Sequence, residues 1–341
     1  MAKSCIFSFF FFSLLLGHGV IELEASTPVY RNFKLPLSNP FQPYRTDYHF
    51  QPAKNWMNEA KILSIGLKLN NHYILKKKLE MWECPDFFPV SNNSQKGVDT
   101  SMIGLNIRLS LIVLRTGGIL WGWIIELSSE ADNVKKGWAG LQAVPRSLWL
   151  DKSGKQLMQW PIAEVEKLRE NPADVEISFR ITEFEKAEVM DPSWTDPESL
   201  CIQKGASVKG ALGPFGLLVL ASKNLKEYTA VFFRIFKNQN KYAVLMCSDQ
   251  RSSSLNNDNK KTTYGAFLDV DPVHDKLSLR SLIDHSIVES FGGGGKACMT
   301  ARVYPTMATD DEAHLYAFNY GTEKINITNL SAWSMKKVRI N

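Results

Sequence analysis

A single glutamate in an aromatic and proline-rich setting is the residue in this chain best suited to acid–base chemistry. Residues 81–90 read Met-Trp-Glu-Cys-Pro-Asp-Phe-Phe-Pro-Val, which places Glu83 between Trp82 and Cys84. Apolar surroundings raise the pKa of a carboxyl group and keep a proton available near neutral pH, as a general acid requires. The sequence therefore offers Glu83 as a candidate catalytic acid. The alternative is an ordinary surface glutamate between a strand and a loop.

Other residues that could do chemistry have weaker contexts. His49 lies among aromatic residues, where a packing role is expected, and Cys84 has no neighbouring histidine base, which favours a buried thiol over a nucleophile. The glycines at 292–295 are not followed by the Lys-Ser/Thr and helix of a phosphate-binding loop, so they predict a hairpin loop. We predict no metal site and no cofactor, because the cysteines lack the C-x-x-C spacing typical of metal ligands.

The composition is that of a globular protein. The chain has 341 residues, of which 44% are hydrophobic and 11% aromatic, enough for two domains with sizeable cores. The net charge of +5 is spread thinly, and the largest basic clusters are the lysines at 76–78 and 260–261. Such short clusters predict solvated faces, so nucleic acid is not an expected partner.

Alternation of apolar and polar residues predicts β-strands over most of the chain. Residues 105–111 alternate in this way, and 119–124 form a buried strand run followed by shorter strands. A helical stretch at 161–168 has acidic residues near its start and basic residues near its end, and is predicted to link two domains. From Val175 onward, repeated strand signatures predict an antiparallel β-sandwich, so the predicted fold class is all-β.

The first 25 residues have the order of a secretory signal peptide. A short basic start is followed by an apolar run at 5–16 and by Ala25-Ser26, where we expect cleavage. Later apolar runs are too short for a transmembrane helix. We therefore expect a soluble, secreted protein with no membrane partner.

Export would affect cysteines and asparagines in the rest of the chain. An oxidising compartment would permit a disulfide between Cys201 and Cys247, which both lie in strand-like surroundings. Three sequons could carry glycan, and they begin at Asn92, Asn326 and Asn329.

A series of motifs resembles the plant acid β-fructofuranosidases of glycoside hydrolase family 32. In the N-terminal half these are Tyr44-Arg45-Thr46, His49-Phe50-Gln51-Pro52, Asn55-Trp56-Met57-Asn58, Trp82-Glu83-Cys84-Pro85-Asp86, Trp121-Gly122-Trp123 and Gly137-Trp138-Ala139-Gly140. In the C-terminal half they include Asp191-Pro192-Ser193-Trp194, Leu212-Gly213-Pro214-Phe215-Gly216, Asp284-His285-Ser286-Ile287-Val288-Glu289 and Arg302-Val303-Tyr304-Pro305. The proline that follows Cys84 resembles the motif of the cell-wall branch of this family, and that branch includes invertases and fructan exohydrolases.

The resemblance implies a five-bladed β-propeller that carries the active site, followed by a β-sandwich. It also implies retaining hydrolysis of terminal β-fructosyl linkages in sucrose or fructans by two carboxylates. Glu83 matches the acid/base catalyst of the family. The substrate-binding positions that the resemblance implies are Gln51, Asn55, Trp56 and Asp86.

The chain departs from the family pattern at the other carboxylates. Where the family has a nucleophilic aspartate in Asn-Asp-Pro-Asn-Gly, this chain has Asn58-Glu59-Ala60-Lys61, and no Arg-Asp-Pro precedes Glu83. Glu59 is a doubtful substitute for the nucleophile, because it is one methylene longer and lacks the turn that would aim it. Five blades need about 20 strands, whereas residues 26–170 can supply roughly three blades.

These observations predict a signal peptide at 1–25, an incomplete propeller at 26–170 and a sandwich at 171–341. The expected function is that of an extracellular or cell-wall β-fructofuranosidase with impaired activity, whose partners are sucrose or fructans and, as a further candidate, cell-wall polysaccharide. The alternatives are a non-catalytic carbohydrate-binding or invertase-interacting protein, and a non-functional product of mis-splicing or of a gene-model error.

Overall fold

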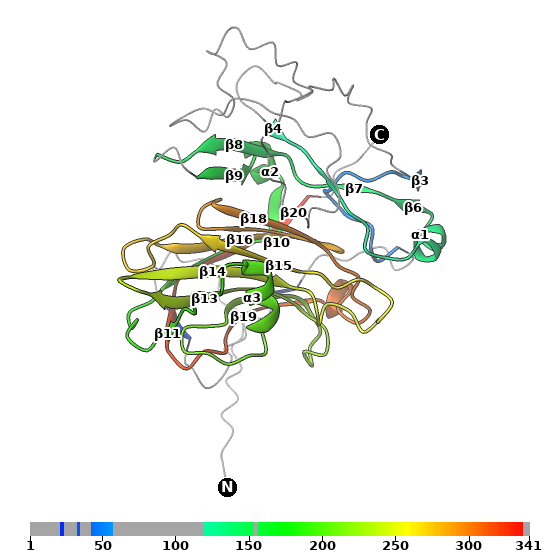
Figure 1. Ribbon diagram of the computed structural model, residues 1–341. Coiled ribbons are helices and arrows are strands. Elements are labelled where there is room, and N and C mark those ends of the chain that lie inside the picture. The colour runs from blue at the N-terminus through cyan, green and yellow to red at the C-terminus, as the bar shows by residue number, and fades with distance from the viewer. Residues whose placement is uncertain (1–20, 24–32, 35–41, 57–118, 153–155, 337–341) are drawn as a thin grey trace, which may run out of the picture.

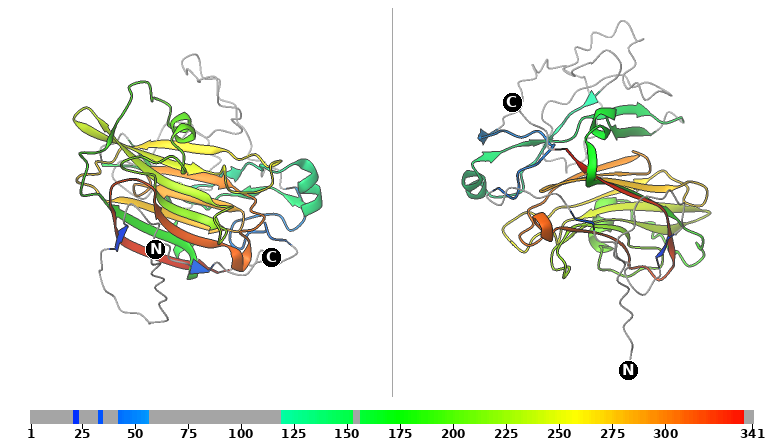
Figure 2. Two further views of the ribbon diagram at one scale, coloured as in Figure 1. Left: turned by 90° about the horizontal axis from the view of Figure 1, so that it is seen from below. Right: turned by 180° about the vertical axis from the view of Figure 1, so that it is seen from behind.

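The computed structural model describes residues 21–23, 33–34, 42–56, 119–152 and 156–336, and only the backbone of 21–23, 33–34, 56 and 170–173. Three layers are stacked in Figure 1, with small sheets and short helices at the top and two large sheets below them. The view from behind in Figure 2 shows the same stacking. The all-β fold class predicted from the sequence is confirmed.

The middle layer is a six-stranded sheet whose paired strands all run antiparallel. In spatial order its strands are β1 (Ile21–Leu23), β20 (Ile325–Met335), β10 (Arg169–Arg180), β16 (Leu277–Asp284), β17 (Ile287–Gly292) and β18 (Ala297–Arg302).

The lower layer is a seven-stranded sheet, antiparallel except for one short strand. Its main path contains β15 (Thr263–Leu268), β14 (Lys241–Asp249), β13 (Thr229–Asn238), β12 (Phe215–Ala221), β19 (His314–Asn319) and β2 (Phe33–Lys34). The short strand β11 (Glu188–Val189) pairs parallel to β13.

The main hydrophobic core lies between these two sheets. In β10, Val175, Ile177 and Phe179 face the core because alternate side chains of a strand point to the same side. The ring of Phe179 packs edge to face against Phe215 at 5.1 Å and against Phe233 at 6.1 Å between ring centroids. Burial of each such ring contributes about 2–3 kcal/mol, so the sandwich has a self-sufficient source of stability.

Helix α3 (Pro197–Gln203) covers the outer side of the seven-stranded sheet (Figure 1). Asp196 caps the helix by accepting a hydrogen bond from the Glu198 N–H at 3.1 Å. Pro197, at the first helical position, has no N–H that would need a partner. The disulfide between Cys201 and Cys247, which the sequence suggested, is present and ties α3 to β14.

The upper layer consists of small sheets in which β3 pairs with β6, β5 pairs with β7, and β8 lies between β4 and β9. Its strands are β3 (Asn55–Trp56), β4 (Ile119–Leu120), β5 (Trp123–Ile124), β6 (Trp138–Ala139), β7 (Leu141–Gln142), β8 (Arg146–Leu150) and β9 (Leu157–Pro161). The short helices are α1 (Glu130–Lys136) and α2 (Ala163–Glu166) in this layer and the 3₁₀ turn η1 (Asp310–Glu312) in the sandwich.

Two predicted elements differ from the structure. The predicted strand at 119–124 is broken at Gly122, whose carbonyl accepts the Ala143 N–H at 2.8 Å, so that β4 and β5 pair with different strands. The predicted helix at 161–168 is a single turn, because Pro161 still pairs with Arg146 as the last residue of β9 and Ile162 is extended.

Helix α1 was not predicted, although its ends carry ordinary signals. The Ser129 hydroxyl accepts the Asp132 N–H at 3.1 Å while the Asp132 carboxylate accepts from the Ser129 N–H, which is a capping box with aspartate in place of glutamate. The helix ends at Gly137, whose φ of 79° is the left-handed conformation that glycine tolerates at helix ends.

Ion pairs join the upper layer to the six-stranded sheet. Glu289 of β17 is fully buried and accepts from the Arg146 guanidinium of β8 at 3.2 Å, and the buried Arg280 of β16 pairs with the exposed Glu166 of α2 at 3.2 Å. Breaking one partner of a buried pair leaves an uncompensated charge, which is strongly destabilising. The upper layer is therefore held to the sandwich by specific charges as well as by apolar contact.

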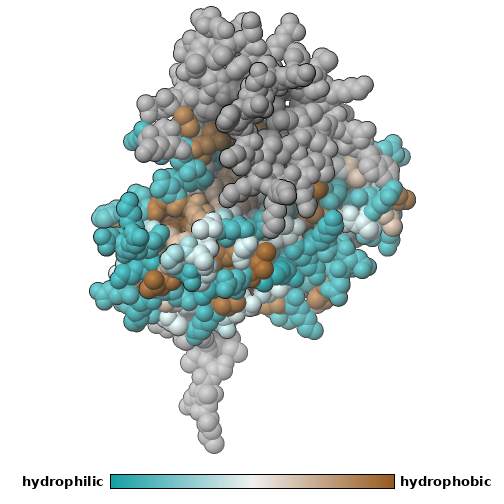
Figure 3. All heavy atoms as spheres, viewed as in Figure 1, coloured by the Kyte–Doolittle hydropathy of each residue, from teal (hydrophilic) through white to brown (hydrophobic). Residues whose placement is uncertain are grey.

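The hairpin between β17 and β18 closes the edge of β9. The Gly295 carbonyl accepts the Gln159 N–H at 2.9 Å, and a Cβ at Gly295 would lie 2.4 Å from the Gln159 carbonyl oxygen. The hairpin loop predicted at 292–295 is confirmed. In Figure 3 the sandwich surface on the side shown is mostly hydrophilic, with hydrophobic residues in small separate groups.

Candidate active site

Strand β3 brings the first predicted sugar-binding residues beside β6. Asn55 pairs in parallel with Trp138, and its N–H donates to the Gly137 carbonyl at 2.9 Å. Asn55 has a φ of 66°, a left-handed conformation that asparagine tolerates better than most residues. Its side chain is exposed, so its amide is accessible to a ligand.

The loop before β3, residues 42–54, is named here the anchor loop. Gln51 in this loop is buried, and its carboxamide accepts from the Thr46 N–H at 3.2 Å and donates to the Thr46 carbonyl at 3.0 Å. The Arg45 guanidinium donates to the Ala53 carbonyl at 2.8 Å. The side chain of Gln51 thus braces the anchor loop, while the side chain of Asn55 is accessible to a ligand.

Three large aromatic side chains are exposed in the anchor loop and in the upper layer at and before β5. Phe50 and Trp121 pack edge to face at 6.4 Å, and the Gln142 N–H donates to the Phe50 carbonyl at 3.0 Å. Trp123 pairs with Gln142 across β5 and β7, and the exposed fractions of Phe50, Trp121 and Trp123 are 40%, 47% and 42%. Exposed aromatic faces suit the apolar C–H faces of sugars.

A cavity of about 470 Å³ adjoins Trp123 and lies between the upper layer and the sandwich. Its lining includes Trp123, Ile125, Arg146, Tyr264 and Arg302. The volume is in the range of small-molecule sites, and the lining mixes apolar surface with a few polar groups, as such sites do. Trp121 and Trp123 belong to a motif that was identified through the family resemblance. The two tryptophans could also have been recognised as candidate ligand contacts from their residue type alone.

Cations surround the buried ring of Trp138. Lys136 Nζ lies 4.3 Å from the ring centroid, and the guanidinium groups of Arg45 and Arg302 lie at 5.4 and 5.7 Å. Glu126 accepts from Arg302 at 3.1 Å and from Lys136 at 3.5 Å. This packing fixes Trp138, the partner of β3.

Two of the charged groups around Trp138, Glu126 and Lys136, have shifted pKa values. Burial acts to raise the pKa of Glu126, but Arg302 and Lys136 hold it below the ordinary value, so the carboxylate is ionised. Burial and the charge of Arg302 lower the pKa of Lys136 to about 8.

The candidate catalytic and remaining binding residues lie outside the described part of the chain. These are Glu83, Glu59 and Asp86, together with Cys84 and the sequon at Asn92. Trp56 is described by its backbone alone, as the last residue of β3.

The two C-terminal sequons lie in β20, where a bulge affects their orientation. Ser178 pairs with Asn329 but the next residue, Phe179, pairs with Ile327, so Thr328 is an extra residue. Ile327 faces the core, and after the bulge Leu330 does so too. Asn326 and Asn329, three residues apart, therefore share the outer face of the sheet, where without a bulge they would lie on opposite faces.

Two further properties concern only the described residues. Among them, no group of three or more His, Cys, Asp or Glu side chains has a geometry that could hold a metal ion. Their helices are too short and too polar for any to cross a membrane.

Comparison with known proteins identifies the family. Residues 161–334, more than half of the chain, match the family described as "Glycosyl hydrolases family 32 C terminal". The chain belongs to glycosyl hydrolase family 32. Residues 113–161 match the N-terminal domain of the same family, and the resemblance recognised from the sequence motifs is confirmed.

The most similar relatives include plant enzymes of two kinds. Fructan 6-exohydrolase of Beta vulgaris is 50% identical over 335 residues, which cover 76% of this chain and 55% of the relative. An insoluble isoenzyme of β-fructofuranosidase from Arabidopsis thaliana is 45% identical over 342 residues, covering 76% and 58%. The chain spans about half the length of the curated relatives it matches.

The solved structure of fructan 1-exohydrolase IIa from Cichorium intybus supports the fold assignment. It is 43% identical to this family 32 chain, has a TM-score of 0.70, and the match covers 76% of this chain and 62% of that one. The same enzyme in complex with 1-kestose matches at a TM-score of 0.63 and 50% identity, over 65% and 46% of the two chains. The fold is that of a family 32 sandwich preceded by part of a propeller.

Proposed function

We propose that this protein acts on terminal β-fructosyl linkages of sucrose or fructans, with impaired hydrolysis. The observation that carries the proposal is the exposed side chain of Asn55 on β3, in a chain 50% identical to a fructan exohydrolase over the matched residues. The relatives are named as fructan exohydrolases and β-fructofuranosidases, and these two names define the substrate classes to test.

The proposed mechanism assigns one role to each group. Asn55, Trp56 and Asp86 bind the terminal fructosyl unit, and Glu83 protonates the oxygen of the leaving group as the glycosidic bond breaks. A retaining reaction also needs a carboxylate that attacks the anomeric carbon. Glu59 is the candidate for that role, and its length and sequence context make it a poor nucleophile.

The test is release of fructose by the secreted chain, residues 26–341. We expect rates at least about 1,000-fold below those of an intact family enzyme with sucrose, 1-kestose or inulin, because the usual nucleophile is replaced. Any residual activity should disappear in both Glu83→Gln and Glu59→Gln. Full-rate hydrolysis would contradict the proposed impairment, and residual activity that survives in Glu83→Gln would contradict the role of Glu83.

A second candidate function is sugar binding without hydrolysis. The exposed group of Phe50, Trp121 and Trp123 supports it, because stacking on aromatic rings does not require the missing nucleophile. Calorimetric titration with sucrose and 1-kestose separates the two functions. Binding with no fructose release favours the second, and in that case Trp121→Ala should weaken binding more than Trp194→Ala, a tryptophan of the sandwich.

We also propose that the protein is secreted to the cell wall and carries glycans at Asn326 and Asn329. The name of a relative from Pisum sativum, a cell wall isozyme of β-fructofuranosidase, supports this location, as does the disulfide between Cys201 and Cys247. Both asparagines lie on the side of β20 that faces away from the core, which supports glycosylation at these positions. Mass spectrometry of the exported protein before and after enzymatic deglycosylation tests the two sites.

The proposed domain limits are a signal peptide at 1–25, a propeller part at 26–170 and a sandwich at 171–341. Cleavage at residue 25 would also remove β1 from the edge of the six-stranded sheet. Strand β10, which begins at Arg169 and runs through the middle of the six-stranded sheet, supports the second limit. Limited proteolysis should release a stable fragment that begins close to residue 170.

A further inference from the structure

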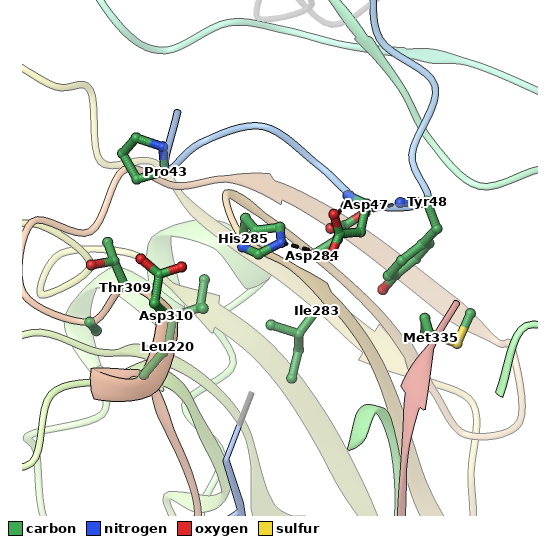
Figure 4. A pocket seen from close by; sticks show the side chains of 12 residues that line it. Pro43, Asp47, Tyr48, Leu220, Ile283, Asp284, His285, Thr309, Asp310 and Met335 are labelled. Atoms are coloured by element: carbon green, nitrogen blue, oxygen red, sulfur yellow. Dashed lines mark hydrogen bonds and ion pairs between the residues drawn. The ribbon is translucent and has the colours of Figure 1, made fainter. Parts of the chain in front are cut away.

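Asp284, far from the candidate site in sequence, binds the backbone of the anchor loop. Its carboxylate accepts hydrogen bonds from the consecutive N–H groups of Asp47, Tyr48 and His49 at 2.7, 3.0 and 3.0 Å. The Asp284 side chain is buried, and Figure 4 shows Asp47, Tyr48, Asp284 and His285 side by side where the loop meets the sandwich. Successive N–H groups of this kind form a concave binding site for a negative charge.

Side chains around this carboxylate add three further contacts. His49 Nδ1 lies 2.8 Å from Asp284, and His285 Nε2 lies 3.2 Å from the Asp47 carboxylate. The Ser286 hydroxyl donates to the Tyr44 carbonyl at 2.6 Å. The end of β16 and the turn after it therefore bind the anchor loop at several points.

The charge of Asp284 is retained although it is buried. Burial acts to raise the pKa of this carboxyl, but its hydrogen bond with His49 and the backbone N–H groups hold the pKa below the ordinary value. A neutral replacement would accept fewer hydrogen bonds and would direct an N–H group at the donors of the loop.

The anchor loop is braced between this contact and β3. The Thr46 hydroxyl donates to the His49 carbonyl at 2.9 Å, and Gln51 makes two hydrogen bonds with the Thr46 backbone. The Arg45 guanidinium donates to the Ala53 carbonyl, so the two ends of the loop are also joined. A loop cross-linked in this way moves as a unit. Displacement at residues 47–49 would therefore also displace Phe50 and Asn55.

We propose that Asp284 is a positioning residue for the sugar-binding group on β3 and the anchor loop. The proposal rests on the proposed function in one respect, since it takes Asn55 and Phe50 to be sugar contacts. In this proposal the buried Asp284 acts through the loop and not by contact with the sugar. It fixes the backbone at 47–49 and, through the braced loop, the position of Phe50 and Asn55.

The experiment compares Asp284→Asn with Asp249→Asn. Asp249 is also a buried carboxylate of the sandwich that accepts backbone N–H groups, from Arg251 at 3.1 Å and Ala206 at 3.3 Å, but these partners lie outside the anchor loop. Amide hydrogen exchange of residues 42–56 is measured for both variants and the wild type. Affinity for sucrose and 1-kestose is measured by calorimetry.

We expect Asp284→Asn to increase exchange in residues 42–56 and to weaken sugar binding, each by at least about tenfold, because charge-assisted hydrogen bonds are lost. Asp249→Asn should lower the melting temperature with neither effect. Equal exchange in the two variants, or increased exchange with unchanged sugar affinity, would overturn the proposal.

A milder variant covers the case in which Asp284→Asn fails to fold. Asp47→Asn weakens the pairing with His285 while leaving the Asp284 carboxylate in place, and should increase exchange of the anchor loop about threefold with a matching loss of sugar affinity. Unchanged exchange in Asp47→Asn would count against the proposal. If the wild-type chain binds neither sugar, the proposed function fails, and the exchange comparison still decides whether Asp284 positions the loop.

Discussion

The sandwich and the upper layer are built on different physical principles. Strands of the sandwich such as β10 and β13 contain 12 and 10 residues and bury one side against a shared aromatic core. Most strands of the upper layer contain 2 residues, and the layer is joined to the sandwich by buried ion pairs such as Arg146 with Glu289. The sandwich should therefore be insensitive to changes in the upper layer, whereas the upper layer depends on the sandwich.

The largest expected effect is loss of a core ring of the sandwich. Phe233→Ala should lower the free energy of unfolding by about 3–5 kcal/mol, because it removes a fully buried ring and leaves a cavity beside Phe179 and Phe215. Both regions should unfold together in chemical denaturation. Unfolding of the upper layer at an unchanged midpoint would contradict the dependence described above.

A smaller and more local effect is expected at the contact between the layers. Glu289→Gln removes the buried counter-charge of the Arg146 guanidinium, which is 11% exposed, and should cost about 2–3 kcal/mol. Proteolysis within residues 119–152 should become faster while the sandwich stays resistant. Glu164→Gln, which changes an exposed carboxylate paired with the exposed Lys167, is the control and should leave both regions unchanged.

The contact of the anchor loop should depend on pH. His285 is partly desolvated by burial, which acts to lower its pKa, but its hydrogen bond with Asp47 and the charges of Asp284 and Asp310 raise the pKa above the ordinary value. A raised pKa in the folded state stabilises the fold below about pH 6.5, and this contribution is lost as the pH rises through the folded-state pKa.

The measurement is calorimetry of the wild type and His285→Asn from pH 5 to pH 9. Asparagine tolerates the φ of 53° at this position, so the variant should fold. We expect the wild type to have the higher melting temperature at acid pH, with the difference shrinking as the pH rises. The other ionisable groups around this contact are His49, Tyr48, Asp174, Glu289 and Arg280, and they are the same in both proteins. A difference that grows with pH would contradict the assignment.

The smallest expected effect is in α1 of the upper layer. Ser129→Ala removes the cap of this helix and should cost about 1 kcal/mol or less. Because the helix packs at the edge of the upper layer, exchange should increase within residues 130–136 and remain unchanged in β10 and β13. Increased exchange in the sandwich strands would show stronger coupling between the regions than the structure implies.

The difference between the two regions also explains which of their strands and helices could be predicted from the sequence. Val175, Ile177 and Phe179 alternate with polar residues, so the sandwich strand was predictable from its own pattern. A two-residue strand of the upper layer is too short to show an alternating pattern of apolar and polar residues. The break in the run at 119–124 depends instead on the hydrogen bond from the Ala143 N–H to the Gly122 carbonyl, which the sequence does not show. Helix α1 was missed because its capping box uses Asp132 where glutamate is usual.

Only those residues of the candidate site that belong to a recognisable sequence motif could be predicted. Asn55 was identified through its motif, and the structure describes its side chain as exposed. The bracing contacts of Gln51 and the binding of the anchor loop by Asp284 could not be predicted, because they join residues whose proximity is set by the fold and not by spacing. For Asp284 that separation is more than 230 residues along the chain.

The bulge at Thr328 determines how β20 would respond to a change in its length. Ile327 and Asn329 pair with the adjacent residues Phe179 and Ser178, so deleting the extra Thr328 would leave a regular strand with every later residue on its present side. Deleting Ser331, which pairs with Glu176, would instead turn Ala332 away from the core. Protein engineering that shortens this strand should therefore remove the bulge residue and no other.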